Sequence, residues 1–317
     1  MHIPDGFLDL RTLATAAGLA TVGVGLALRE LRRGLPARRV PLLGLAAAFV
    51  FAAQMLNFPV AAGTSGHLIG AALASVLLGP AAAVIAMTAV LLLQSLMFAD
   101  GGITALGANV LNLAVIAPLV AYGVYAGVRR IAGDSLQAML LAAGFAAWCS
   151  TIAAALACAA QLAASGIADW NTVLAAMGSV HMLIGLGEAV ITMLILVVVI
   201  RARPELLEVA TTSPVSHRAK AVYGVMAAVG VMVLIAPFAS SLPDGLEHVA
   251  EQFGFADRAA VARPAPLPDY GVTALTGDSP WLSAVLAGTV GALLAFAIAW
   301  FVARVLATPG RAAARHR

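Results

Sequence analysis

Long apolar runs recur along most of this chain and constrain its fold more than any other feature. Most measure about 17 to 25 residues, enough for a helix to cross a hydrocarbon layer of about 30 Å. Because no water reaches the backbone inside a bilayer, each run is predicted to be a helix. The run at 68–79 is short, which favours a broken or tilted element. The predicted spans are 10–29, 40–60, 68–79, 80–98, 103–128, 135–163, 171–200, 220–238 and 281–304.

The composition also indicates a membrane protein. Of the 317 residues, 62% are hydrophobic and only 10% are charged, which excludes a water-soluble domain for most of the chain. We predict an all-α fold, a polytopic membrane helix bundle with about seven spans in the core and about two C-terminal spans. Basic residues outnumber acidic ones by 18 to 15, but they cluster at the ends of apolar runs. We therefore expect contact with the lipid bilayer and no nucleic-acid partner.

The placement of the basic residues predicts an orientation. Most of them fall in alternate loops, as cytoplasmic loops do, whereas the other side carries Asp5, Asp9, Asp100 and Asp169. We expect the N-terminus outside and the C-terminus inside, in the cell inner (plasma) membrane. The predicted cytoplasmic set is Arg29, Arg32, Arg33, Arg38, Arg39, Arg129, Arg130, Arg201, Arg203, Arg218, Lys220, Arg304, Arg311, Arg315 and Arg317.

A polar segment, RARPELLEVATTSPVSHRAK at 201–220, divides the chain. We expect a membrane domain at 1–200, a cytoplasmic linker at 201–220 and a two-span unit at 221–317. The two spans of that unit flank an external loop at about 239–280. Within the loop, GLEHVAEQFGF is predicted to form a short helix that ends near Gly254.

The first two residues, in MHIPDGFLDL, form a metal chelator by local geometry alone. No basic region precedes the first apolar run, so we expect no cleaved leader and a free amine on Met1. That amine, the amide nitrogen of His2 and its Nδ1 close fused five- and six-membered rings around an ion. A deprotonated amide suits Cu(II) and Ni(II), sometimes Co(II), and suits zinc, calcium and magnesium poorly. The alternative is a solvated terminal histidine.

His67 is the natural candidate for a fourth ligand. It lies in NFPVAAGTSGHLIG, a polar, glycine-rich interruption that the orientation places on the same side as Met1. Glycines at 63, 66 and 70 permit a close backbone approach. The alternative is a histidine that only satisfies hydrogen bonds near the end of a span.

Polar side chains within the apolar blocks are few, so each is a candidate to support the ligands. Asn109 and Asn112 share a helical face and could hold an imidazole tautomer or only bridge helices. His181 and Glu188, two turns apart, could form a second metal site or a proton relay, although a pair that fixes helix packing is favoured. The candidates to support the site are Asp5, Gln54, Asn57, Ser65, Asn109, Asn112, His181 and Glu188.

The external loop contains PDGLEHV, which repeats the Pro-Asp-Gly of the N-terminus. Its Asp244, Glu247 and His248 could attract a cation outside the membrane. Pro-Asp-Gly is also an ordinary turn and helix-start signal, and we favour that interpretation.

Four segments of the chain resemble one family: MHIPDGFLD, GTSGHLIGAALASVLLGP, LLLQSLMFADGGITALGANVLNL and HMLIGLGEAV. They are similar in order and spacing to the CbiM and NikM proteins, the substrate-binding subunits of cobalt and nickel energy-coupling factor transporters. The resemblance covers about residues 1–200. The remainder resembles the fused C-terminal extension of NikMN proteins, with its PDGLE motif.

The resemblance implies a square-planar site for transported Ni²⁺ or Co²⁺. The amine of Met1, the amide and Nδ1 of His2 and a ring nitrogen of His67 would hold the ion. It also implies a CbiQ/NikQ-like transmembrane coupling subunit and CbiO/NikO-like ATPase subunits as partners. The fused extension favours nickel slightly.

ATP hydrolysis is not expected of this chain. Its single lysine is Lys220, and no GxxxxGK[ST] motif occurs, so we predict a transport subunit without an ATP site. A secondary transporter or channel that works alone on an ion gradient is the alternative function. An intramembrane enzyme built on His181 and Glu188 is disfavoured, because no HExxH motif is present.

Overall fold

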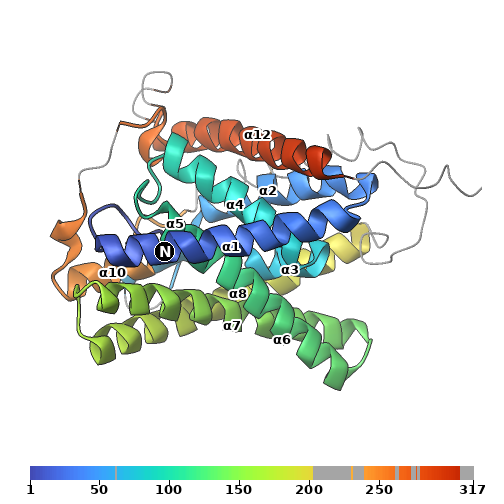
Figure 1. Ribbon diagram of the computed structural model, residues 1–317, viewed down its shortest axis with the longest axis horizontal. Coiled ribbons are helices and arrows are strands. Elements are labelled where there is room, and N and C mark those ends of the chain that lie inside the picture. The colour runs from blue at the N-terminus through green and yellow to red at the C-terminus, as the bar shows by residue number, and fades with distance from the viewer. Residues whose placement is uncertain are drawn as a thin grey trace, which may run out of the picture.

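A computed structural model of the chain describes residues 1–60, 63–202, 230, 239–260, 264–272, 276 and 279–307. Most of these residues lie in helices (Figure 1). Among the residues described, 7 helices are long and apolar enough to cross a membrane. The chain is therefore a multi-pass membrane protein, and the predicted helix bundle is confirmed. The spans are Leu10–Gly34, Ala37–Gln54, Pro80–Met97, Leu106–Ala132, Leu136–Ala164, Trp170–Arg201 and Trp281–Leu306.

These spans correspond to seven labelled helices or helix groups and are joined by shorter elements. The long elements are α1 (Leu10–Gly34), α2 (Val40–Gln54, after the 3-10 turn η1 at Ala37–Arg39), α4 (Pro80–Met97), α5 (Leu106–Asn109) continued by the π-helix η3 (Val110–Ile116) and α6 (Ala117–Ala132), α7 (Leu136–Ala164), α8 (Trp170–Ala202) and α12 (Pro280–Leu306). The short elements are β1 (Asn57–Pro59), β2 (Ser65–His67), α3 (Ala71–Leu78), α10 (Gly245–Gln252), η6 (Ala256–Arg258) and η7 (Pro268–Tyr270).

The region around His67 departs from the predicted spans. The helix expected at 40–60 ends at Gln54, and β1 then pairs antiparallel with β2. The span expected at 68–79 is only α3, whose 8 residues rise about 12 Å and cannot cross a bilayer. The core was predicted to have about seven spans. In the structure it has six long helices and the short α3. The predicted span 220–238 and most of the linker 201–220 lie outside the described residues.

Local capping fixes where two of the helices begin. The Asp9 carboxylate accepts a hydrogen bond from the backbone N–H of Thr12 at 2.8 Å and so starts α1. At α10, Asp244 and Glu247 form a capping box, in which each side chain accepts a hydrogen bond from the backbone of the other. The short helix predicted in the external loop is confirmed, and Gly254, with φ of 72°, follows its end.

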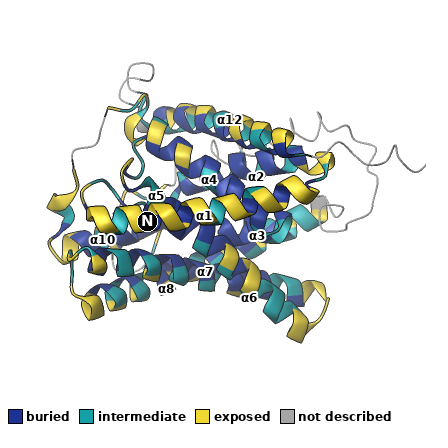
Figure 2. Ribbon diagram, in the orientation of Figure 1, coloured by how far each residue is buried: buried dark blue, intermediate teal, exposed yellow. Residues whose placement is uncertain are grey.

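The bundle is arranged around α4. Figure 1 shows α12 running along α2 on one side of the molecule, with α6, α7 and α8 on the opposite side. Within the most apolar stretch of each helix, 72% of α4 is buried but only 17% of α1 (Figure 2). The exposed face of α1 is apolar, as a lipid-facing surface requires, and it includes Leu19, Val22 and Leu26.

Several segments that are distant in sequence meet at one end of the bundle. Figure 1 shows α10, in orange, at the same end as the start of α1. The N-terminal residues, the hairpin of β1 and β2, and the loop after α4 also reach this end, as the contacts below show. This end of the bundle holds the predicted ligands.

Candidate metal centre

The Met1 amine and His67 are in direct contact. The amine lies 2.8 Å from Nε2 of His67, and only 4% of Met1 and 7% of His67 is exposed. The imidazoles of His2 and His67 are stacked, with ring centroids 5.4 Å apart and planes inclined by 10°. The three residues predicted to carry metal ligands therefore lie side by side.

The hairpin and α3 fix the position of His67. In the antiparallel ladder His67 lies opposite Asn57, at the end of β2 nearest α3. Two predicted residues hold the chain just beyond it. Gln54 donates from Nε2 to the carbonyl of Ile69 at 2.8 Å, and Glu188 accepts from the Gly70 backbone N–H at 3.0 Å.

His2 is held by a carboxylate that the sequence analysis did not select for the site. Its Nδ1 lies 2.9 Å from Oδ1 of Asp100, and its side chain is only 7% exposed. Tyr270 donates from its hydroxyl to Oδ2 of the same carboxylate at 2.6 Å. The other ring nitrogen of His2, Nε2, is buried and has no hydrogen-bond partner among the residues described.

The PDGLE segment reaches the Met1 amine. The amine donates to Oδ2 of Asp244, the residue that also caps α10. Ser65 anchors this segment, since its backbone N–H donates to the carbonyl of Pro243 at 2.8 Å and its hydroxyl to that of Leu242 at 2.7 Å. The C-terminal extension thus packs against the strand that carries His67.

The N-terminal segment is fixed by its own turn. Asp5 accepts hydrogen bonds from the backbone N–H of Thr104 at 2.8 Å and from that of Ile103 at 3.2 Å. Gly6 has φ of 96°, and a Cβ there would lie 2.9 Å from the backbone nitrogen of Ala260, so only glycine fits. Asp5 therefore ties the turn to the loop after α4.

The remaining predicted residues have partners of their own. Asn112 exchanges two side-chain hydrogen bonds of 2.8 Å with Gln161 on α7. His181 bonds through Nδ1 to the Met177 carbonyl at 2.8 Å, and its buried Nε2 is unpartnered among the residues described. Among the described residues no hydrogen bond joins His181 to Glu188, whose second oxygen accepts from the hydroxyl of Thr151 at 2.7 Å.

In the external loop, Glu247 serves the capping box by accepting from the Asp244 backbone N–H at 2.8 Å. His248 is half-buried on α10. Of the three loop residues predicted to attract a cation, Asp244 alone contacts the Met1 amine.

Burial and charge set the ionisation of the site. Burial, aided by the positive charge of the Met1 amine, lowers the pKa of His67 to about 3, so its ring is neutral and Nε2 can accept. Burial alone would raise the pKa of Asp244, but the charge of the amine and the hydrogen bonds from the amine and the Glu247 backbone together lower that pKa. Burial would also raise the pKa of Asp100, but its pairing with His2 and the hydrogen bond from Tyr270 together lower it.

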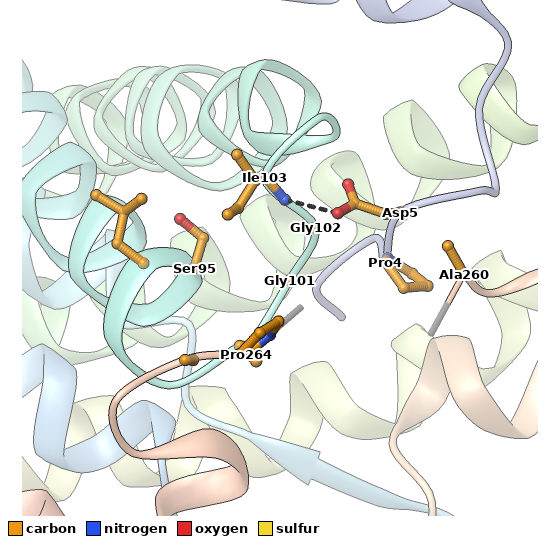
Figure 3. Close-up of a pocket in the computed structure, with 11 residues that line it drawn as sticks. Pro4, Asp5, Ser95, Gly101, Gly102, Ile103, Ala260 and Pro264 are labelled. Atoms are coloured by element: carbon orange, nitrogen blue, oxygen red, sulfur yellow. Dashed lines mark hydrogen bonds between the residues drawn. The ribbon is translucent and has the colours of Figure 1, made fainter. Parts of the chain in front are cut away.

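A small cavity of about 70 Å³ lies beside the N-terminal turn (Figure 3). Its lining includes Pro4 and Asp5 of the N-terminal turn, Gly101 and Gly102 of the loop after α4, and Ala260 of the extension. This volume is about that of two water molecules, and Met1, His2 and His67 are not among the lining residues.

The nitrogen atoms at this end of the bundle include main-chain groups as well as imidazoles. Within the part of the chain that the structure describes, no group of three or more His, Cys, Asp or Glu side chains could hold an ion. Met1 and His2 supply main-chain nitrogens next to two imidazoles, which is the donor set that a planar nitrogen site needs.

Comparison with known proteins assigns the chain to a family. The family model for CbiM, the cobalt uptake substrate-specific transmembrane region, matches residues 2–206, and the PDGLE domain model matches residues 218–308. The chain belongs to the CbiM family. The resemblance drawn from the sequence motifs is thereby confirmed.

Relatives within the CbiM family share the fused layout. A fused NikMN-type protein of Archaeoglobus fulgidus is 36% identical over 97% of this chain and 100% of its own length. The fused nickel transport protein NikMN of Rhodobacter capsulatus is 35% identical over 75% of this chain and 72% of its own length. The crystal structure of a truncated transition metal transporter matches with a TM-score of 0.58 and 33% identity, covering 64% of this chain and 99% of that one.

Two residues at the site were missed from the sequence. Asp100 follows a predicted span in MFADGG. An acidic residue at the end of an apolar run and before two glycines could have been selected as a candidate site residue from the sequence. Tyr270 lies 170 residues further on in a proline-rich loop, and no local pattern links it to Asp100.

Proposed function

We propose that the chain is the substrate-specific subunit of an ATP-driven importer of the energy-coupling factor type for Ni²⁺ or Co²⁺. It captures the ion outside, in a square-planar site formed by the Met1 amine, the amide and Nδ1 of His2 and Nε2 of His67. The N-terminus lies outside and the C-terminus inside the cell inner membrane. Residues 1–200 form the metal-binding domain, 201–220 a cytoplasmic linker and 221–317 a two-span unit.

The contact between Met1 and His67 carries this proposal. Two neighbouring nitrogen ligands, each about 2.0 Å from a metal at a right angle, are about 2.8 Å apart. The amine and Nε2 are 2.8 Å apart, which is the spacing of one edge of such a site. To bind an ion, both residues need only turn their lone pairs from each other toward it.

His2 would complete the square by changing partner. Its Nδ1 leaves Asp100, gives up the proton that it donates there and binds the ion, and its amide nitrogen also loses its proton to bind. The Met1 amine likewise gives up the proton that it donates to His67. Capture of the dication therefore releases protons, and their return helps the ion to leave inward.

Energy would come from other subunits. The lack of a phosphate-binding loop in the sequence supports a CbiQ/NikQ-like coupling subunit and CbiO/NikO-like ATPases as partners. A secondary transporter is the rival. Protein reconstituted alone in liposomes would then move nickel down a gradient, whereas our proposal expects transport only with ATP and the partner subunits.

Nickel is the favoured substrate. Relatives with the same fused layout carry names of nickel transport, while the family description refers to cobalt. The planar nitrogen set also favours Ni²⁺ over Co²⁺ in the usual affinity order.

Moving the amine tests the site directly. An extension of one or two residues before Met1 removes the amine from the chelate and leaves every side chain in place. We expect calorimetry to show loss of Ni²⁺ and Co²⁺ binding in this protein and in His67→Ala. The same residues added at the C-terminus are the matched control and should leave binding unchanged. Full-strength binding by the N-terminally extended protein would exclude the site.

A further inference from the structure

The C-terminal extension reaches the site at two separate points, once by direct contact with the Met1 amine and once through Asp100. At the first, Oδ2 of Asp244 accepts from the Met1 amine. Oδ1 of the same carboxylate accepts from the backbone of Leu246 at 2.7 Å and of Glu247 at 3.0 Å. The carboxylate is therefore held by the start of α10, and one oxygen is fixed in place for the amine.

The second point is Tyr270, which reaches His2 through Asp100. Its ring stacks on Phe98, with centroids 4.7 Å apart. Backbone hydrogen bonds of 2.9 Å join Asp269 to Phe98 and Leu267 to Met97, so this segment is tied to the end of α4. The Tyr270 hydroxyl donates to one oxygen of Asp100, while the other oxygen faces His2 Nδ1.

We propose that the extension completes the metal site with two positioning residues: Asp244 orients the Met1 amine, and Tyr270 controls the hold of Asp100 on His2. This inference rests on the proposed function, because it assigns roles around that same site. The fused extension is then part of the metal centre, and residues 1–200 alone form an incomplete one.

Asp244 is suited to remain in place when the ion binds. A metal-bound amine keeps two hydrogens, so it can still donate one of them to Asp244. That hydrogen bond fixes the rotation of the amine and directs its lone pair toward the space beside His67. Such contacts around metal ligands typically account for about 10-fold to 100-fold in metal affinity.

Tyr270 acts on a contact that must break. His2 Nδ1 can bind the ion only after it leaves Asp100. The Tyr270 hydroxyl donates a hydrogen bond to this carboxylate. The carboxylate is then a weaker acceptor for the His2 ring, so the contact between Asp100 and His2 is easier to break. Without the hydroxyl, Asp100 holds His2 more tightly and competes better with the ion.

The experiment uses the full-length protein in detergent, with Ni²⁺ alone as the ligand. Asp244→Asn keeps the helix cap, since asparagine caps as well as aspartate, but it turns an amide donor toward the amine. Tyr270→Phe removes the hydroxyl and keeps the stack on Phe98. Glu251→Gln, an exposed change of carboxylate to amide on α10, is the control for Asp244, and exposed Tyr122→Phe is the control for Tyr270.

We expect Asp244→Asn and Tyr270→Phe each to weaken Ni²⁺ binding in calorimetry by about 10-fold or more. The unfolding temperature of the metal-free proteins should stay near the wild-type value. The visible absorption band of planar Ni(II) should shift in Asp244→Asn, which a purely structural role would not cause. In an Asp100→Asn background Tyr270→Phe should have no further effect, because Tyr270 acts through Asp100.

The controls separate this inference from the proposed function. If the wild type binds no Ni²⁺, or if His67→Ala binds it as the wild type does, the proposed function is wrong and the inference falls with it. If His67→Ala loses binding while Asp244→Asn and Tyr270→Phe keep wild-type affinity and spectrum, only the inference is wrong. Equal effects of Tyr270→Phe with and without Asp100→Asn would overturn the role of Tyr270.

Discussion

Asn109 pairs with both backbone polar groups of Ile3. Its Oδ1 accepts from the Ile3 N–H at 2.8 Å, and its Nδ2 donates to the Ile3 carbonyl at 3.0 Å. Ile3 is 0% exposed and Asn109 is 2% exposed, so no solvent can replace these bonds. The pairing fixes the direction of residue 3 and with it the two residues that precede it.

Loss of this pairing should weaken both the fold and metal binding. Asn109→Leu has a similar volume but leaves the buried Ile3 N–H unpaired, at about 1–3 kcal/mol, while the Ile3 carbonyl still accepts from the Gly102 backbone N–H at 2.9 Å. We expect a lower unfolding temperature and at least a tenfold loss of Ni²⁺ affinity in calorimetry. Asn112→Leu, which breaks the pair with Gln161, is the comparison: it should lower the unfolding temperature and spare the affinity. Similar affinities for the two variants would contradict the role of Asn109.

The long helices could be predicted because apolar length is a local property of the sequence. The run expected at 135–163 is α7, Leu136–Ala164, and the run expected at 281–304 lies within α12, Pro280–Leu306. The hairpin could not be predicted in this way. Each of its strands has only 3 residues, too few to show an alternating pattern, and Asn57–Pro59 continued an apolar run.

Part of the site followed from local chemistry. Met1 and His2 are adjacent, so their chelating geometry is visible in the sequence. His67 was predicted from its place in a polar, glycine-rich interruption on the same side as Met1, and the family resemblance implied the same residue. The contacts of Asp244 with Met1 and of Tyr270 with Asp100 join residues 243 and 170 positions apart. Only tertiary packing brings such residues together, so periodicity and spacing contained no trace of either contact.

The donor set predicts an order of metals. An amide nitrogen binds only ions that favour planar nitrogen fields, so we expect Cu²⁺ to bind most tightly, then Ni²⁺, then Co²⁺. Zn²⁺ prefers a tetrahedron and should bind poorly. Competition calorimetry should show that a tenfold excess of Zn²⁺ fails to displace Ni²⁺. Displacement by Zn²⁺ would indicate a tetrahedral site built from side chains.

His67 should make the stability of the metal-free protein depend on pH. Its pKa falls from 6.5 in the unfolded chain to about 3 in the folded protein, so between these values only the unfolded chain binds the proton. The free energy of unfolding should therefore fall as the pH falls through this range, by about 1.4 kcal/mol per pH unit. The lowered pKa values of Asp100 and Asp244 cost stability only below about pH 4.

Chemical unfolding in detergent between pH 7 and pH 5 measures this contribution. His67→Gln has no titrating ring, so the stability of this variant should depend less steeply on pH than that of the wild type. The difference between the two slopes should approach one proton per molecule. Parallel curves for the two proteins would show that the ring of His67 is accessible to protons in the folded state.

The packing of the hairpin against α8 gives the last prediction. Gly66 precedes His67 in β2, and a Cβ at this position would lie 2.5 Å from Cγ2 of Ile184, closer than real atoms approach. Gly66→Ala should therefore push the hairpin off α8 and move His67 away from the Met1 amine. We expect at least a tenfold loss of Ni²⁺ affinity, together with a loss of stability of about 1–3 kcal/mol.

A second substitution should reverse the effect. Ile184→Ala removes both γ carbons and leaves only the Cβ, 3.3 Å from the added methyl group, so Gly66→Ala/Ile184→Ala should regain affinity relative to Gly66→Ala. Gly25→Ala on α1, where a Cβ meets nothing within 4 Å, is the matched glycine control. Ile184→Ala adds no new contact of its own, so recovery of affinity in the double variant would indicate that the hairpin has returned to its position. A double variant as weak as Gly66→Ala would show that the close contact with Ile184 is not the reason for glycine at this position.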